Sequence, residues 1–122
     1  FYFEHGIYSK EKEGNKILDI GPETVKLYAR IISSARTIIW NGPMGYFENK
    51  KFKNGTEKIA KAILKNKKAE VVIGGVETVA ALPLKAKKQN YGKVFISTGG
   101  GAMLEFLADK KLPGIESLKR KK

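Results

Sequence analysis

Four short apolar runs, each followed by a segment with helical spacing, constrain the fold of this chain more than any other feature. The runs are KILDI (16–20), TIIWN (37–41), AEVVIGG (69–75) and KVFIST (93–98). Short apolar runs of this kind are typical of strands that are buried on both faces, as in a parallel sheet. They therefore predict a sheet whose strands are separated along the chain by other elements.

The segments between the runs carry apolar residues at helical spacing, as Ile59, Ala60, Ile63 and Leu64 illustrate. Helices are expected over 23–35, 54–66, 77–89 and 102–110. Pro83 should bend or end the third of them. The alternation predicts an α/β fold of the three-layer, Rossmann-like kind, in which about four parallel strands alternate with helices through right-handed crossovers.

The first 15 residues differ from the rest of the chain. Their mixed polar and aromatic composition, with Gly6 and Gly14, predicts an irregular N-terminal segment (1–15), whereas 16–122 is expected to be one folding unit. The single histidine, His5, lies in this segment, and we do not expect it to be catalytic. Because the chain starts at Phe1 and not at methionine, we expect a fragment or a processed product.

The net charge bears on possible partners. The chain carries 24 Lys+Arg against 12 Asp+Glu, a formal charge of +12. This charge fits a surface for a polyanion, or a solvated lysine surface in which lysines gather at helix ends and loops. Arginine, which usually leads base recognition, is scarce, so nucleic acid is not expected as the main partner. The absence of cysteine is compatible with a reducing cytoplasm, the location we expect, and no apolar run approaches the ~18 residues of a membrane span.

Glycine is concentrated where each run passes into the next helical segment. The four junctions read DIGPET (19–24), NGPMGYFE (41–48), GGVET (74–78) and STGGGA (97–102). In a parallel α/β sheet such junctions fall on one rim, outside the carboxyl ends of the strands, where ligands bind. Each following helix presents unpaired N–H groups and the positive end of its dipole. The rim is therefore a candidate phosphate site.

Two interpretations fit the three consecutive glycines of the last junction. Gly99, Gly100 and Gly101 could form only a tight strand-to-helix turn. Alternatively, they remove side chains so that backbone N–H groups at a helix start can approach an anion. One glycine would satisfy the first interpretation, so three in a row favour the second.

Two carboxylates at these junctions are candidate ligand contacts. Glu77 follows Gly74-Gly75 and begins a helix beside Thr78, where it could hold Mg²⁺ or merely complement the helix dipole. Glu48 could accept hydrogen bonds from ribose hydroxyls or be an ordinary surface acid. The P-loop pattern, the G-x-G-x-x-G dinucleotide pattern and a histidine pair with metal spacing are all absent from the sequence.

The motifs DIGP, WNGPMGYFE, GGVETVAA and STGGGAMLEFL followed by LPGI resemble the phosphoglycerate kinase family, in its C-terminal, nucleotide-binding domain. The order and spacing match over 18–118, so 16–122 resembles the C-terminal part of that domain. The resemblance implies phosphoryl transfer between 1,3-bisphosphoglycerate and ADP, giving ATP and 3-phosphoglycerate in glycolysis, with Mg²⁺. It also implies that 3-phosphoglycerate is held by an N-terminal domain that is not in this chain.

The resemblance assigns roles to residues at the junctions. It implies a set of nucleotide-binding residues, namely Leu18, Asn41, Pro43, Glu48, Gly74, Gly75 and Thr78. Among them Leu18 would line the adenine pocket and Glu48 would bind the ribose hydroxyls. Glu77 would meet the metal. The backbone of Gly99, Gly100 and Gly101 would stabilise charge on the transferring phosphoryl group, as phosphoryl transfer requires.

The chain departs from the family pattern in one junction and in length. The family's usual G-G-G-D-T is here GGVET, so Val76 adds a side chain and Glu77 is one methylene longer than aspartate. The family's other domain is absent, and we expect the chain alone to be inactive. Two alternatives are a basic, non-catalytic binding module that keeps the fold, and a half sheet with a bare edge and a bare apolar face.

Overall fold

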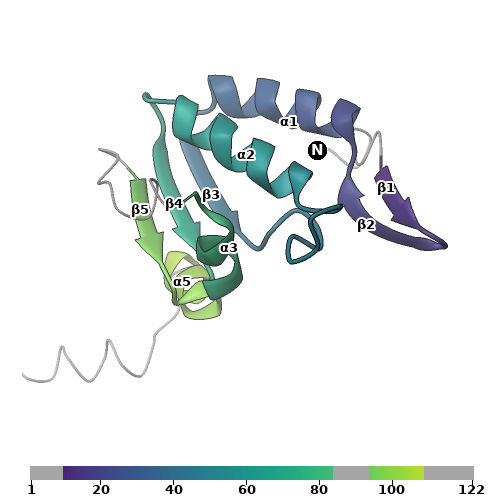
Figure 1. Ribbon diagram of the computed structural model, residues 1–122. Helices are drawn as coiled ribbons and strands as arrows, with labels where there is room; N and C mark the ends of the chain where they lie inside the picture. The colour runs from purple at the N-terminus through teal and green to yellow at the C-terminus, as the bar shows by residue number, and fades with distance from the viewer. Residues whose placement is uncertain (1–9, 84–93, 109–122) are drawn as a thin grey trace, which may run out of the picture.

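The computed structural model describes residues 10–83 and 94–108 (Figure 1). Its centre is a parallel three-stranded sheet of β3 (Thr37–Asn41), β4 (Glu70–Gly74) and β5 (Val94–Ser97), in the order β3-β4-β5. The register pairs Ile39 with Val72 and Val72 with Phe95. The predicted α/β class, a parallel sheet alternating with helices, is confirmed.

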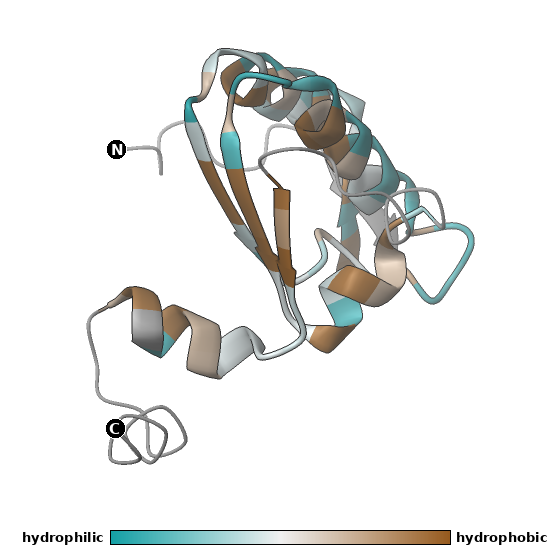
Figure 2. Cartoon of the chain, turned by 90° about the vertical axis from the view of Figure 1, so that its left-hand side faces the viewer, coloured by the Kyte–Doolittle hydropathy of each residue, from teal (hydrophilic) through white to brown (hydrophobic). Residues whose placement is uncertain are grey.

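Four helices follow strands in the described part of the chain. α1 (Pro22–Ser34) and α2 (Asn54–Lys65) pack side by side on one face of the sheet (Figure 1). α3 (Val76–Ala81) and α5 (Gly100–Leu107) begin at the carboxyl ends of β4 and β5. In Figure 2, α5 extends to the side of the sheet away from α1 and α2.

The core lies between the sheet and the pair α1 and α2. Side chains alternate along a strand, so Ile38 and Trp40 point to the same face, and both are buried. Val71 and Ile73 do the same on β4, and Ile63 from α2 packs into this cluster. The hydrophobic spacing of the sequence thus places the apolar stripe of α2 on the sheet.

The opposite face of the sheet carries an exposed apolar row. Ile39 is 52% exposed and Phe95 is 63% exposed, and the register places half-buried Val72 between them. The middle parts of the strands are brown in Figure 2, which shows how apolar the centre of the sheet is. Burial on both faces was expected, but among the described residues it is found on the α1 and α2 face only.

The prediction for the first run was wrong. KILDI forms β2 (Lys16–Ile20), but it pairs antiparallel with β1 (Lys10–Glu13) in a separate two-stranded sheet. Lys16 and Ile17 are exposed, and only the carboxyl end of the strand is buried. β1 also lies within the segment 1–15 that was expected to be irregular. Its sequence KEKE has no apolar residue, so no hydrophobic pattern could indicate a strand.

Helix ends follow the local sequence, with one shift. α3 ends at Ala81, so Pro83 ends this helix as expected, since the residue before a proline disfavours helical geometry. α5 begins at Gly100, two residues before the predicted start, which places two glycines in its first turn. His5, the rest of the predicted helix 77–89 and the C-terminal LPGI lie outside the described residues. In the part of the chain that is described, none of the helices has both the length and the hydrophobicity to cross a bilayer.

Candidate phosphate-binding cleft

The carboxyl ends of the three parallel strands lie level with one another. The register pairs Asn41 of β3 with Gly74 of β4, and Gly74 with Ser97 of β5. The junctions that follow these strands are therefore on one rim, as the sequence predicted. The fourth junction follows β2, which is in the separate sheet.

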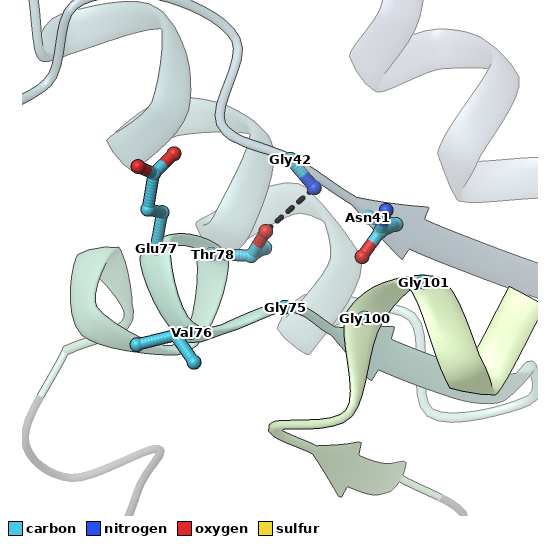
Figure 3. Close-up of a pocket in the computed structure, with 8 residues that line it drawn as sticks. All are labelled: Asn41, Gly42, Gly75, Val76, Glu77, Thr78, Gly100 and Gly101. Atoms are coloured by element: carbon cyan, nitrogen blue, oxygen red, sulfur yellow. Dashed lines mark hydrogen bonds between the residues drawn. The ribbon is translucent and has the colours of Figure 1, made fainter.

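An open cleft of about 260 Å³ lies on this rim. It is lined by Asn41, Gly42, Gly75, Val76, Glu77, Thr78, Gly100 and Gly101 (Figure 3). Pockets for whole drug-sized ligands measure roughly 300–1,000 Å³. The cleft is therefore suited to the phosphate groups of a ligand, with the remainder of the ligand outside it.

Glycine is required by the backbone at two places in the cleft. Gly42 has φ +97° and Gly75 has φ +93°, in the region that L side chains rarely adopt. A Cβ at Gly75 would also lie only 2.9 Å from the Asn41 Oδ1 atom. Gly42 is therefore favoured by its backbone conformation alone, because a Cβ there would meet nothing within 4 Å, whereas Gly75 is also required by the close approach of Asn41.

The three consecutive glycines have three different environments. A Cβ on Gly100 would lie 3.1 Å from the Gly75 Cα, so this glycine allows two backbone turns to pack closely. A Cβ on Gly101 would meet nothing within 4 Å, although Gly101 lines the cleft. Gly99 is exposed outside the cleft, and its N–H donates to the Ser97 Oγ at 3.1 Å. Tight packing thus explains Gly100, whereas Gly101 leaves open space for a ligand.

Backbone donors face the cleft from α5. The Met103 N–H donates to the Gly99 carbonyl at 2.8 Å, so the N–H groups of Gly100 and Gly101 precede the first bond within the helix. They carry the positive end of the helix dipole. An anion in the cleft would meet these two donors.

Thr78 connects two walls of the cleft. Its side chain is fully buried, and its Oγ1 accepts a hydrogen bond of 2.6 Å from the Gly42 N–H (Figure 3). The bond holds the turn after β3 against α3. The hydroxyl keeps its own proton, so it can still donate one hydrogen bond.

Glu77 and Val76 are both exposed at the cleft and project in different directions (Figure 3). Val76 is 68% exposed, which is unusual for an apolar residue at a polar site. The described residues contain no group of three or more His, Asp or Glu side chains that could hold a metal. A metal here would therefore have Glu77 as its carboxylate and need phosphate oxygens and water for the remaining positions.

Several residues predicted for the site lie outside the cleft. Gly74 is buried, because α5 packs its Met103 against it, and Gly99 is exposed beside the cleft. Leu18 is half-buried on β2, and Pro43 and Glu48 lie in the loop 42–53 that joins β3 to α2. Of the residues predicted for the site, the structure brings Asn41, Gly75, Glu77, Thr78, Gly100 and Gly101 together in the lining of the cleft.

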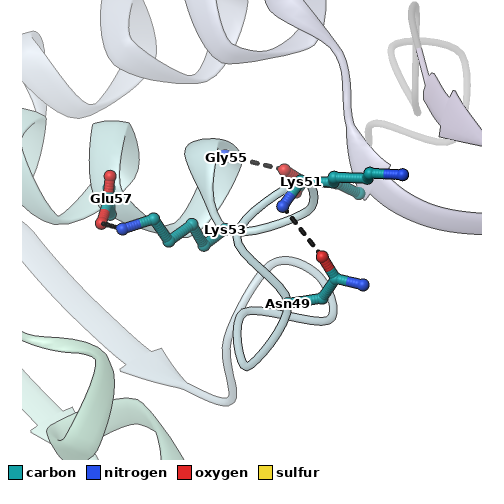
Figure 4. Close-up of polar contacts among 6 residues, drawn as sticks. Asn49, Lys51, Lys53, Gly55 and Glu57 are labelled. Carbon is teal, nitrogen blue, oxygen red and sulfur yellow. Dashed lines mark hydrogen bonds and ion pairs between the residues drawn. The ribbon is translucent and has the colours of Figure 1, made fainter.

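Sequence reasoning did not name Gly42 and Val76 as site residues, although the sequence drew attention to both positions. Gly42 directly follows a β-branched strand, which is where a left-handed turn is expected. Val76 was noted only as a departure from a family pattern. The buried carboxylate of Asp19 was also missed: it accepts from the Gly55 N–H at 2.9 Å. Figure 4 shows Gly55 at the start of α2. No local pattern marks Asp19, because its partner is 36 residues away.

Comparisons with known proteins agree with this geometry. The family model described as phosphoglycerate kinase matches residues 4–110. The phosphoglycerate kinase of Koribacter versatilis is 52% identical over 104 residues, which are 85% of this chain and 25% of that protein. The solved phosphoglycerate kinase of Coxiella burnetii is 42% identical with a TM-score of 0.69, over 83% of this chain and 25% of that one.

A second solved structure gives the same result. The phosphoglycerate kinase of Pyrococcus horikoshii OT3 is 40% identical, with a TM-score of 0.71, over 85% of this chain and 25% of that chain. The chain thus spans about a quarter of the length of the relatives it matches. By the family model, the sequence identities and the shared fold, this chain belongs to the phosphoglycerate kinase family.

Proposed function

We propose that the chain is the nucleotide-binding part of a phosphoglycerate kinase, which transfers a phosphoryl group between 1,3-bisphosphoglycerate and ADP to give ATP and 3-phosphoglycerate in glycolysis. The observation that carries the proposal is the cleft on the carboxyl rim, which is lined by Gly100 and Gly101 at the start of α5, ahead of the first hydrogen bond within that helix. Membership of the family favours this function over a basic, non-catalytic binding module. A cytoplasmic location is part of the same proposal.

The cleft would bind the phosphate groups of ADP or ATP. The N–H groups of Gly100 and Gly101 would donate to oxygens of the transferring phosphoryl group, and Thr78 Oγ1 would donate its proton to a neighbouring oxygen. Donors fixed in advance act on charge that grows in the transition state, and one such donor is worth roughly 100- to 1,000-fold in rate. The packing of Gly100 on Gly75 fixes these donors.

Mg²⁺ is the metal that the proposal includes. Glu77 is the carboxylate that would hold it, together with phosphate oxygens of the nucleotide. When bound, the ion would neutralise phosphate charge. The exposed position of Glu77 leaves space for the water ligands that Mg²⁺ normally keeps.

The nucleoside would lie beside the cleft, on the side of β2 and the loop 42–53. These two segments are joined, because the Tyr46 N–H donates to the Leu18 carbonyl at 2.8 Å. We assign Leu18 to the adenine, Asn41 and Pro43 to contacts along the nucleotide, and Glu48 to the ribose hydroxyls. Glu48 is exposed and therefore accessible to such a ligand.

The chain alone should not catalyse the transfer. Among the described residues, the lining of the cleft contains no lysine or arginine, and its one charged residue is the acidic Glu77. Transfer of a phosphoryl group needs cations to stabilise its charge. We propose that these cations and the site for 3-phosphoglycerate belong to the larger part of the protein that this chain does not span.

Two variants at neighbouring residues test the proposal. Gly101→Leu places a side chain in the open space of the cleft, whereas Ala102→Leu places the same side chain at an exposed position outside it. We expect calorimetric titration with Mg·ADP to show binding to the wild type and to Ala102→Leu, and at least a tenfold loss with Gly101→Leu. Equal affinity of both variants would contradict the assignment of the cleft.

A further inference from the structure

The loop 42–53 has no helix or strand of its own, yet two buried threonines hold its first residues. The Gly42 N–H donates to Thr78 Oγ1 at 2.6 Å, and the Met44 N–H donates to Thr56 Oγ1 at 3.0 Å. Both threonines are 0% exposed. The two amides are two residues apart, but the threonines belong to different helices, α3 and α2.

The hydroxyl of Thr56 has an unusual use. Thr56 lies in the first turn of α2, three residues after the N-cap position at which serine and threonine commonly accept from the amides of their own helix. Here the N-cap residue of α2 is Lys53, which makes no side-chain cap, and the Thr56 hydroxyl accepts from Met44 in the preceding loop. The side chain therefore serves the loop and not the helix.

Other contacts fix the same loop beyond Met44. The Tyr46 N–H donates to the Leu18 carbonyl, and Phe52 is buried at the far end of the loop. Figure 4 shows the loop end, where the Lys51 N–H donates to Asn49 Oδ1 at 3.0 Å. Along the loop, the contact of Thr56 with Met44 thus falls between the Gly42 contact at the cleft and the Tyr46 contact with β2.

We propose that Thr56 is a positioning residue for the nucleoside part of the nucleotide. Its hydroxyl sets the path of the loop after Gly42, and so the distance from the cleft to the loop residues that would meet the ribose. Thr78 fixes the phosphate end of the same loop. The inference rests on the proposed function, and it predicts that the two ends of the ligand respond separately to substitutions of the two threonines.

The test compares Thr56→Val, which keeps the shape and removes the acceptor, with Thr56→Ser, which keeps the hydroxyl. Thr37→Val is the matched control, because Thr37 is exposed at the amino end of β3, whereas the cleft lies at the carboxyl ends of the strands. We expect Thr56→Val to weaken the binding of ADP about tenfold, as the loss of one hydrogen bond would. The binding of inorganic tripolyphosphate, which has no nucleoside, should stay unchanged, and Thr56→Ser should restore the affinity for ADP.

Hydrogen exchange of the Met44 amide gives a readout that needs no ligand. The exchange should be faster in Thr56→Val than in the wild type, Thr56→Ser or Thr37→Val. Unchanged exchange of Met44, or an equal loss of affinity for ADP and tripolyphosphate, would overturn the inference. If the wild type bound neither ADP nor tripolyphosphate, the proposed function would fail. Faster exchange of the Met44 amide in Thr56→Val would then still show that Thr56 anchors the loop, so the two failures can be told apart. Thr56→Ala replaces Thr56→Val if valine prevents folding.

Discussion

Alanine at two adjacent glycines should have opposite effects on stability, which tests the reading of the triglycine turn. Gly100 and Gly101 occupy neighbouring positions in the first turn of α5. A Cβ on Gly100 would lie 3.1 Å from the Gly75 Cα, a backbone atom that cannot rotate away. A Cβ on Gly101 would meet nothing within 4 Å. The two substitutions therefore share their chemistry and differ in their surroundings.

The magnitudes follow from these surroundings. Gly101→Ala reduces the freedom of the unfolded chain without a clash, so it should raise the free energy of unfolding by about 0.4–1 kcal/mol. Gly100→Ala has the same benefit, but overpacking against backbone typically costs about 1–3 kcal/mol. The difference between the variants should be about 2 kcal/mol, with Gly100→Ala the less stable.

Urea unfolding followed by the fluorescence of Trp40, the single and buried tryptophan, measures this difference. The wild type is the reference for both variants. Equal stability of Gly100→Ala and Gly101→Ala would refute the conclusion that Gly100 is required by packing. A less stable Gly101→Ala would refute the conclusion that its place in the cleft is empty of protein atoms.

Further predictions concern four buried or exposed side chains, each measured by urea unfolding. Thr78→Val leaves the Gly42 N–H without its acceptor and should cost about 1–3 kcal/mol, whereas Thr78→Ser should cost less. Asp19→Ala removes the acceptor of the Gly55 N–H and should cost a similar amount, with a loss below about 0.5 kcal/mol contradicting its role. Phe95→Ser should cost less than about 1 kcal/mol, because Phe95 is exposed. Ile73→Ala, at a fully buried site on β4, should cost about 2–5 kcal/mol. A loss for Phe95→Ser above about 1 kcal/mol would show that the sheet face that carries Phe95 is covered.

The parallel sheet could be predicted from the sequence because its strands carry their own signal. TIIWN and the run around Val71 are mostly apolar; Gly42 follows the first, and the second ends in Gly74-Gly75. Both the type of element and the rim that the two strands share therefore follow from local pattern. Which junctions would meet at the cleft could then be predicted as well, because parallel strands bring their carboxyl ends to one rim.

The hairpin of β1 and β2 could not be predicted in the same way. Lys10–Glu13 has only charged residues. KILDI contains the charged Lys16 and Asp19, so it is less apolar than a strand buried on both faces would be. The one local signal is Gly14, with φ +59°, followed by Asn15, a pair typical of two-residue hairpin turns.

The polar anchors of the site were beyond sequence reasoning for a different reason. The roles of Thr56 and Asp19 are not visible in the local sequence, because the partners of their side chains are 12 and 36 residues away. Burial gives these side chains their importance, since an unpaired buried donor or acceptor is costly. Only the packing of α2 against the loop and β2 reveals which groups they satisfy.

A titration of the ¹⁵N-labelled chain with inorganic tripolyphosphate, followed by amide resonances, tests the central claim most directly. The amides of Gly42, Gly75, Gly100 and Gly101 come from three separate junctions on one rim. If the three junctions form one phosphate site, with Gly100 and Gly101 as donors and the already bonded amides of Gly42 and Gly75 beside them, the four resonances should shift together and saturate with a single dissociation constant. Shifts confined to exposed lysines such as Lys58 and Lys61, and lost on addition of salt, would contradict it.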